Sequence, residues 1–318
     1  YPLEQVLSWL KQDLDYLESQ AVPDNGISKI KADDGIINFD LVLIDGSEFT
    51  GKAELEAVYG AKYILLDDIN GFKNRENYDR LKADPDYELT AENWKLRNGY
   101  AIFRRREETL PVHLFTIVLN GEPFIRYHIE QFRELPFKWH WHIVEGVADL
   151  VKDTAWSLPG GGRISDELHR EGRSNDGTSE YLDELQREYP DNITVYRKPA
   201  GEFWEGKLEM VNAPLQNIRE QCLLWEIDVD ELWTAEQITR CRELFFSRPE
   251  KSAACFYCHF LVGQELVITT RDTYGNNTSY EWLRVWRFEP GMKWRSHEPP
   301  QLCRNVEGKW RNLAGWDV

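Results

Sequence analysis

Residues 223–233 read Leu223-Leu224-Trp225-Glu226-Ile227-Asp228-Val229-Asp230-Glu231-Leu232-Trp233, an apolar run that leads into two aspartates spaced by one residue. Such a run, bounded by polar residues, is typical of a buried strand. Residues i and i+2 of a strand lie on the same face, about 6.6 Å apart. Asp228 and Asp230 are therefore predicted to converge on one hard divalent cation, Mg²⁺ or Mn²⁺, which would offset the cost of placing two carboxylates there. The alternative is an acidic turn that faces water.

The composition limits the class of protein. At 318 residues the chain can form one large domain or two. Its net charge of −17 argues against general nucleic-acid binding, which needs a basic surface. An anionic substrate would need a local cation, which a bound metal supplies. The sequence shows no signal peptide, no apolar run near the roughly 20 residues of a membrane span, and five scattered cysteines, so we expect a cytoplasmic protein.

The N-terminal third has a short alternation of predicted elements. Leu3, Val6, Leu7, Leu10 and Leu14 have helical spacing, so residues 3–18 are predicted to form an amphipathic helix. Next come a strand over 39–46, a helix over 52–59, a strand over 61–68, and a hairpin over 87–104 with an Asn-Gly turn.

This order, over residues 38–105, resembles the second half of class I S-adenosylmethionine-dependent methyltransferases. The glycine-rich cofactor turn of that family is missing. We therefore interpret residues 1–108 as a partial, methyltransferase-like α/β segment, in which Asp45, Asp67 and Asp68 are remnants or ordinary strand-end carboxylates. Methyl transfer would require further chain upstream.

A polar break at Arg104-Arg105-Arg106-Glu107-Glu108 is the predicted boundary to a second domain, residues 109–318. His140 and His142 share a face of one of its strands, where they could bind a metal or simply lie half exposed. Residues 148–173 are predicted to be a polar, flap-like insertion. The predicted elements are strands from Val112, over 139–146 and over 193–197, and helices over 123–135, 179–188 and 208–221, the last leading into the strand with the two aspartates.

This order, over about residues 112–300, resembles glycosyltransferases of the GT-A fold, especially family 2-like members. Ser174-Asn175-Asp176-Gly177-Thr178 is similar to the family's Ser-x-Asp-Gly-Thr element, although about 28 residues separate Glu145 from Ser174. Asp228-Val229-Asp230 is similar to the family's metal-binding motif. The resemblance implies a nucleotide-diphospho-sugar transferase with a Rossmann-like mixed sheet.

The resemblance also implies roles for single residues. Asp228 and Asp230 would hold Mn²⁺ or Mg²⁺ and, through it, the donor diphosphate, with His297 as a third ligand. Glu298 is the first candidate for the catalytic base and Asp272 the second, while Glu231 would orient the acceptor. Contacts to the nucleotide or its phosphates are expected from Asn120, Glu145, Asp176, Lys207 and Asn212.

The resulting hypothesis is metal-dependent transfer of a sugar, with inversion, from a nucleotide-sugar to a glycan or another hydroxyl acceptor. Neither a nucleic acid nor a membrane span is expected. The main alternative is a non-catalytic module that binds carbohydrate or a protein partner on the same scaffold. A nucleotidyltransferase is less consistent, since Asn120-Gly121-Glu122 is not the glycine- and arginine-rich loop of such enzymes.

Overall fold

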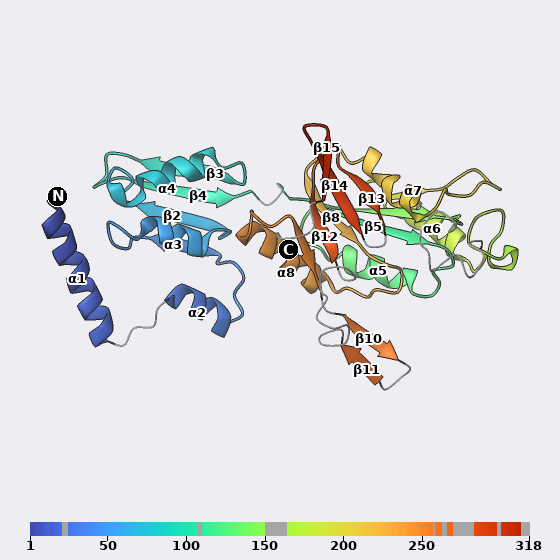
Figure 1. The fold of residues 1–318 in the computed structure, drawn as a ribbon, viewed down its shortest axis with the longest axis horizontal. Coiled ribbons are helices and arrows are strands. Elements are labelled where there is room, and N and C mark those ends of the chain that lie inside the picture. The colour runs from blue at the N-terminus through green and yellow to red at the C-terminus, as the bar shows by residue number, and fades with distance from the viewer. Residues whose placement is uncertain are drawn as a thin grey trace. The chain divides into compact units, whose positions relative to one another are not determined.

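The computed structural model describes eight ranges of the chain, which are residues 1–20, 25–106, 110–149, 164–256, 258–262, 266–269, 283–297 and 300–312. The protein is an α/β protein with mixed parallel and antiparallel sheets (Figure 1). It divides into two compact units, Tyr1–Arg106 and Glu107–Val318, and each is described by itself. In the described ranges, no helix is both long and apolar enough to cross a membrane.

The N-terminal unit is built on a four-stranded sheet. Its strand order is β1-β2-β4-β3, in which β1 and β2 run parallel and β4 runs antiparallel to both neighbours. The predicted strands and hairpin are confirmed. The elements are α1 (Leu3–Ser19), α2 (Gly26–Asp33), β1 (Leu41–Ile44), α3 (Gly51–Val58), β2 (Tyr63–Asp67), α4 (Phe72–Ala83), β3 (Tyr87–Asn93) and β4 (Tyr100–Arg105).

Helix α4 is an element that the hydrophobic pattern does not predict. Part of its buried face is polar: Asn74 Nδ2 donates to the carbonyl oxygens of Ile44 and Asp67, and Asn77 Nδ2 donates to the carbonyl oxygen of Gly51. These amides satisfy backbone groups at the ends of β1 and β2 and at the start of α3, so the helix packs on the sheet with little apolar periodicity.

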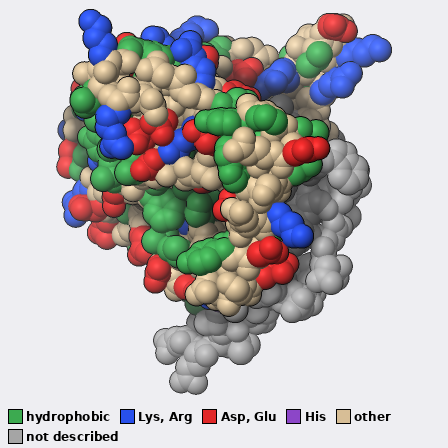
Figure 2. Space-filling view, turned by 90° about the vertical axis from the view of Figure 1, so that its left-hand side faces the viewer, with side chains coloured by type: hydrophobic (Ala, Val, Ile, Leu, Met, Phe, Trp, Pro, Cys, Tyr) green, Lys and Arg blue, Asp and Glu red, His purple; other side chains and the backbone are tan. Residues whose placement is uncertain are grey.

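Helix α1 has the predicted amphipathic pattern but no buried residue. The exposed fraction of Leu3 is 71% and that of Leu14 is 60%. Figure 2 shows hydrophobic side chains exposed in groups between acidic ones on the face drawn there. The core of this unit is formed instead by α3, α4 and the sheet, with Leu55, Ile64 and Phe103 fully buried.

The C-terminal unit is built on a six-stranded sheet in the order β7-β6-β5-β8-β12-β9. Strands β7, β6, β5 and β8 run parallel, and β12 runs antiparallel to β8 and β9. The elements up to β9 are β5 (Val112–Val118), α5 (Ile125–Phe132), β6 (Trp139–Glu145), the 3₁₀ helix η4 (Asp166–Leu168), α6 (Thr178–Glu188), β7 (Ile193–Tyr196), α7 (Lys207–Asn212), the 3₁₀ helix η5 (Pro214–Gln216), β8 (Cys222–Glu226), α8 (Ala235–Ser247) and β9 (Ala253–Cys255).

Two smaller sheets complete the described part of this unit. One is the hairpin of β10 (His259–Val262) and β11 (Leu266–Thr269). The other has three strands, β13 (Lys293–Ser296), β14 (Gln301–Val306) and β15 (Lys309–Asn312), and follows β12 (Leu283–Phe288).

Both faces of the six-stranded sheet are covered. On β8, Leu223 and Trp225 join the apolar cluster that contains α5, α6 and α8, whereas Leu224 joins the cluster on the other face, with α7 and β13. This alternation follows the pleat of the strand. Strand order reverses between β5 and β8, because the chain leaves β5 toward β6 and β7 and returns on the opposite side. Ligands in open α/β sheets gather at the carboxyl ends of the strands at such a point.

Two predicted elements need correction. The helix predicted over 208–221 stops at Asn212, because Pro214 has no N–H for a longer helix and instead begins η5. Strand β8 ends at Glu226, since its pairing with β5 ends there. Asp228 and Asp230 therefore lie in a turn beyond the strand, and the strand alternation that was expected to align them does not apply.

Candidate active site

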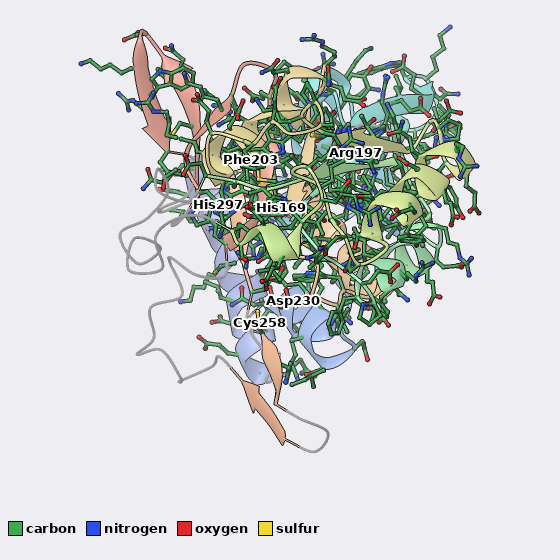
Figure 3. The ribbon with its side chains drawn as sticks, turned by 90° about the vertical axis from the view of Figure 1, so that its right-hand side faces the viewer. His169, Arg197, Phe203, Asp230, Cys258 and His297 are labelled. Atoms are coloured by element: carbon green, nitrogen blue, oxygen red, sulfur yellow. The ribbon has the colours of Figure 1, made fainter. Side chains whose placement is uncertain are left out.

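A pocket of about 340 Å³ lies at the carboxyl ends of β5 and β8, at the point where strand order reverses. Its apolar wall includes Val118, Val229 and Met210. The structure brings four of the predicted site residues into its lining, which are Lys207, Asp228, Asp230 and His297. Figure 3 labels Asp230 and His297.

Carboxylates crowd this pocket. The side chain of Asp228 is 44% exposed, and its Oδ2 lies 3.4 Å from Nη2 of Arg284. Arg284 also donates to Glu231, with Nη2 2.7 Å from Oε1. Burial, together with the nearby carboxylates of Glu226 and Glu231, raises the pKa of Asp228 to about 7. Among the described residues, Arg284 thus offsets only part of the charge of the carboxylates around Asp228, and a further cation would be favoured there.

Glu226 is a member of this group that the sequence analysis does not assign to the site. Its side chain is 6% exposed, and its Oε1 lies 3.0 Å from Nε2 of His297. Its Oε2 is buried without a hydrogen-bond partner. A buried carboxylate oxygen in this state is costly, and a metal ion or a ligand donor would satisfy it. The donor set of carboxylates and one imidazole is of the kind that Mn²⁺ and Mg²⁺ accept.

A hydrogen bond from α5 holds the turn that carries the two aspartates. His128 is 1% exposed, and its Nε2 donates to the carbonyl oxygen of Val229 at 2.9 Å. The backbone N–H of Glu231 donates to the carbonyl oxygen of Asp228 at 2.9 Å, which closes the turn. The turn is therefore fixed from two sides, and His128 positions Asp228 and Asp230 without lining the pocket.

Four of the residues that were expected to contact the nucleotide have side chains engaged in contacts within the protein. Glu145 accepts from the backbone N–H of Ser174 and pairs with Nε of Arg197 at 2.5 Å. Asn212 bridges α7 to β13 through both backbone groups of Trp294. The amide of Asn120 and the carboxylate of Asp176 likewise bind backbone groups of Leu168, Asn175, Glu122 and Thr178.

The three predicted catalytic residues divide between described and undescribed parts of the chain. Glu231 is held by Arg284 beside Asp228. Glu298 and Asp272 lie outside the described residues. The residues 150–163 of the predicted flap also lie outside them.

The N-terminal unit holds a separate acidic group. Asp45, Asp67 and Asp68 form the one group of three possible ligands in the described residues whose ligand atoms all lie within 4.8 Å of one another, so they could bind a metal. Nζ of Lys73 lies 2.5 Å from Asp45 Oδ1 and 3.3 Å from Asp68 Oδ2. This ammonium already offsets part of the charge. Asp228, Asp230 and His297 share a pocket but are not gathered this closely.

Glu226, Arg284 and His128 are the residues of the site that sequence reasoning missed. Glu226 has a visible signal, since a single carboxylate inside an apolar strand requires a partner. The sequence carries no such signal for Arg284 or His128, because Arg284 comes from β12, His128 comes from α5, and both reach the aspartate turn only through the tertiary fold.

Comparisons with known proteins give a partial likeness. No protein-family model matches the chain, and no curated protein matches it. Nine chains of solved structures are similar. One is the crystal structure of S. aureus TarS 1-349, with a sequence identity of 11% and a TM-score of 0.28. The match covers 44% of this chain and 33% of that chain. The match thus spans about a third of that solved chain, and a likeness at this TM-score leaves the function to be argued from the pocket.

Proposed function

We propose that this protein is a metal-dependent glycosyltransferase that moves a sugar from a nucleotide-sugar to an acceptor hydroxyl. The observation that carries the proposal is the pocket at the strand-order reversal, where Lys207, Asp228, Asp230 and His297 come together and neighbouring carboxylates help to raise the pKa of Asp228. A nucleoside diphosphate together with a divalent cation would balance that charge.

The residues of this chain have distinct tasks in the proposal. Asp228 and Asp230, with His297, would hold Mn²⁺ or Mg²⁺, which would attract the phosphates of the donor. When bound, the ion offsets the charge that develops on the departing diphosphate. Lys207 pairs with a phosphate oxygen. Arg284 and Glu231 keep Asp228 in place from the β12 side.

The reaction exchanges one bond at the anomeric carbon for another. The bond from that carbon to the diphosphate oxygen breaks, the bond to the acceptor oxygen forms, and a base takes the proton of the acceptor hydroxyl. Glu298 keeps this role in the proposal, with Asp272 as the second choice. Glu231 is less suited, since its carboxylate is already paired with Arg284, with Nη2 2.7 Å from Oε1.

Calorimetric titration of UDP, GDP and CDP, with and without Mn²⁺, tests the proposal. We expect at least one nucleotide to bind only when Mn²⁺ is present, and Asp230→Ala to abolish this binding while leaving the fold intact. Asp191→Ala, which removes an exposed aspartate beyond the other end of the sheet, should bind like the wild type. If no nucleotide binds, or if Asp230→Ala binds normally, the proposed site is wrong.

A non-catalytic carbohydrate-binding module remains the second candidate, and one observation favours it. The carboxylate of Glu231, which closes the aspartate turn, is paired with Arg284 rather than turned toward an acceptor hydroxyl in the pocket. Product formation from a nucleotide-sugar that binds in the first test distinguishes the two. Binding without turnover or donor hydrolysis would favour the module.

A further inference from the structure

A second cavity, of about 320 Å³, adjoins the first one in the C-terminal unit. The two share Ala148 and Ile164 in their linings. A ligand in the second cavity would therefore lie directly beside a ligand in the first. The proposal made here rests on the proposed function, because it takes the first cavity as the site of the nucleotide-sugar.

The second cavity has an aromatic wall that the backbone holds in place. Phe203 is 47% exposed, and Trp204 beside it is 6% exposed. The backbone N–H of Trp204 donates to the carbonyl oxygen of Val147, its carbonyl oxygen accepts from the N–H of Asp149, and its indole Nε1 donates to the carbonyl oxygen of Glu145 at 3.0 Å. The ring of Phe203 also packs edge to face against His169, 5.4 Å between centroids (Figure 3). The wall offers a fixed aromatic surface to a ligand.

The charges of this cavity differ from those of its neighbour. Its lining contains the carboxylates Asp149, Asp166 and Glu205, and none of its described lining residues is Lys or Arg. A phosphate or another anion would be repelled there. Carboxylate oxygens accept hydrogen bonds from hydroxyl groups, and aromatic rings pack on the apolar face of a pyranose. The lining therefore suits a saccharide without negative charge.

His169 lies behind the lining of this cavity, against Asp166 and Phe203. Its side chain is 6% exposed, and its Nε2 is buried without a hydrogen-bond partner, 3.4 Å from Oδ1 of Asp166. Its Nδ1 accepts from the backbone N–H of Gly172 at 3.3 Å, so Nε2 carries the proton in the neutral ring. The carboxylate of Asp166 lies within ion-pair distance of Nε2, so His169 supports the lining residues Asp166 and Phe203 from behind.

We propose that this cavity binds the acceptor substrate, and that the acceptor is a saccharide that carries no negative charge. Phe203 stacks on the sugar ring, and the carboxylates of Asp166 and Glu205 accept from its hydroxyl groups. The shared wall at Ala148 and Ile164 sets this sugar next to the donor.

Binding of a panel of neutral, amino-bearing and acidic oligosaccharides to the full chain tests the proposal, measured by saturation-transfer NMR and calorimetry at millimolar ligand. We expect neutral or amino-bearing members to bind and acidic ones not to bind. Phe203→Ala should weaken this binding roughly fivefold or more. Phe72→Ala, an exposed phenylalanine of the N-terminal unit, is the matched control and should bind normally.

A charge reversal sharpens the test. The side chain of Asp166 is 98% exposed, so the Asp166→Lys variant should fold normally. It should bind amino-bearing saccharides more weakly than the wild type and should bind acidic saccharides. The proposal is overturned if no saccharide binds, if acidic members bind the wild type best, or if Phe203→Ala leaves binding unchanged. It is also overturned if Phe203→Ala weakens only the binding of the nucleotide-sugar, since the cavity would then hold the donor sugar.

Failure of this proposal can be separated from failure of the proposed function. Saccharide binding that depends on Phe203 in a protein that binds no nucleotide would leave the second cavity in place and remove the transferase. Mn²⁺-dependent nucleotide binding without saccharide binding would support the nucleotide site of the proposed function and rule out the second cavity as an acceptor site.

Discussion

Three histidines pack against one another on β5 and β6, away from the pocket. His113 and His142 are 7% and 3% exposed, and Nδ1 of His113 lies 2.9 Å from Nε2 of His142. His142 also contacts the hydroxyl of Tyr196 at 3.0 Å. His140 stacks on both rings, which agrees with the predicted shared face of His140 and His142. Because burial lowers the pKa of all three histidines, the group is a stack of neutral rings.

Burial of His113 makes the stability of the protein depend on pH. Burial lowers the pKa of His113 from 6.5 to about 4, with Lys138 and His140 acting in the same direction and Glu220 against it. The unfolded chain therefore takes up a proton near pH 6.5 while the folded chain does not. The free energy of unfolding is then highest above pH 6.5 and falls toward pH 4, by on the order of 3 kcal/mol for this residue.

Urea denaturation at several pH values between 4 and 7 measures this effect. His113→Gln should reduce the dependence on pH, even if it lowers stability throughout because His142 loses a partner. His259→Gln changes an exposed histidine and should retain the wild-type dependence. Equal pH dependence in wild type and His113→Gln would contradict the prediction.

His128 is predicted to control metal-dependent binding without touching the ligand. His128→Phe removes the hydrogen bond to the carbonyl oxygen of Val229 and also the buried, unpartnered Nδ1, so the overall stability should change little. The aspartate turn loses a hydrogen bond worth about 1 kcal/mol, which predicts roughly fivefold weaker Mn²⁺-dependent nucleotide binding. Calorimetry checks this. His140→Phe, at the other end of the sheet, should bind normally.

At the scale of elements, the sequence predicts the strands and turns whose residue pattern lies within the element itself. The strands at β5 and β6 are apolar runs, and the turn before α6 has its polar signal in Asp176, whose Oδ1 accepts from the N–H of Thr178 at 3.0 Å. Helix α4 escapes prediction because its buried face is partly polar. The position of Asp228 and Asp230 beyond β8 cannot be predicted from the sequence either, because pairing with β5 decides where β8 ends.

The start of α8, which follows the aspartate turn, has a cap that can be tested. Thr234 Oγ1 accepts from the N–H of Gln237 at 3.1 Å, and Oε1 of Gln237 accepts from the N–H of Thr234 at 2.9 Å. Thr234→Ala should lower the free energy of unfolding by about 1 kcal/mol. Thr239→Ala lies inside the same helix and should cost less, since alanine favours the helix. Urea denaturation of both variants gives the comparison, and equal losses would contradict it.

At the scale of the whole molecule, the site belongs to one unit. The apolar clusters of the C-terminal unit contain residues from Leu110 onward, and the cluster of the N-terminal unit ends at Phe103. Both cavities are lined by the C-terminal unit alone. The polar run at residues 104–108 predicts a boundary between two domains close to the one that the structure has. The sequence could not suggest the second cavity, because that cavity joins segments more than fifty residues apart.

A fragment of residues 107–318 should therefore keep the site. Its core is built without the N-terminal unit, so we expect it to fold and to bind Mn²⁺ and nucleotide within about twofold of the full chain. Calorimetry on the fragment, the full chain and the fragment with Asp230→Ala measures this. The complementary fragment, residues 1–106, should bind no nucleotide, because its acidic group Asp45, Asp67 and Asp68 is already met by Lys73. Loss of nucleotide binding by a folded 107–318 fragment would mean that the N-terminal unit is required to shape the site.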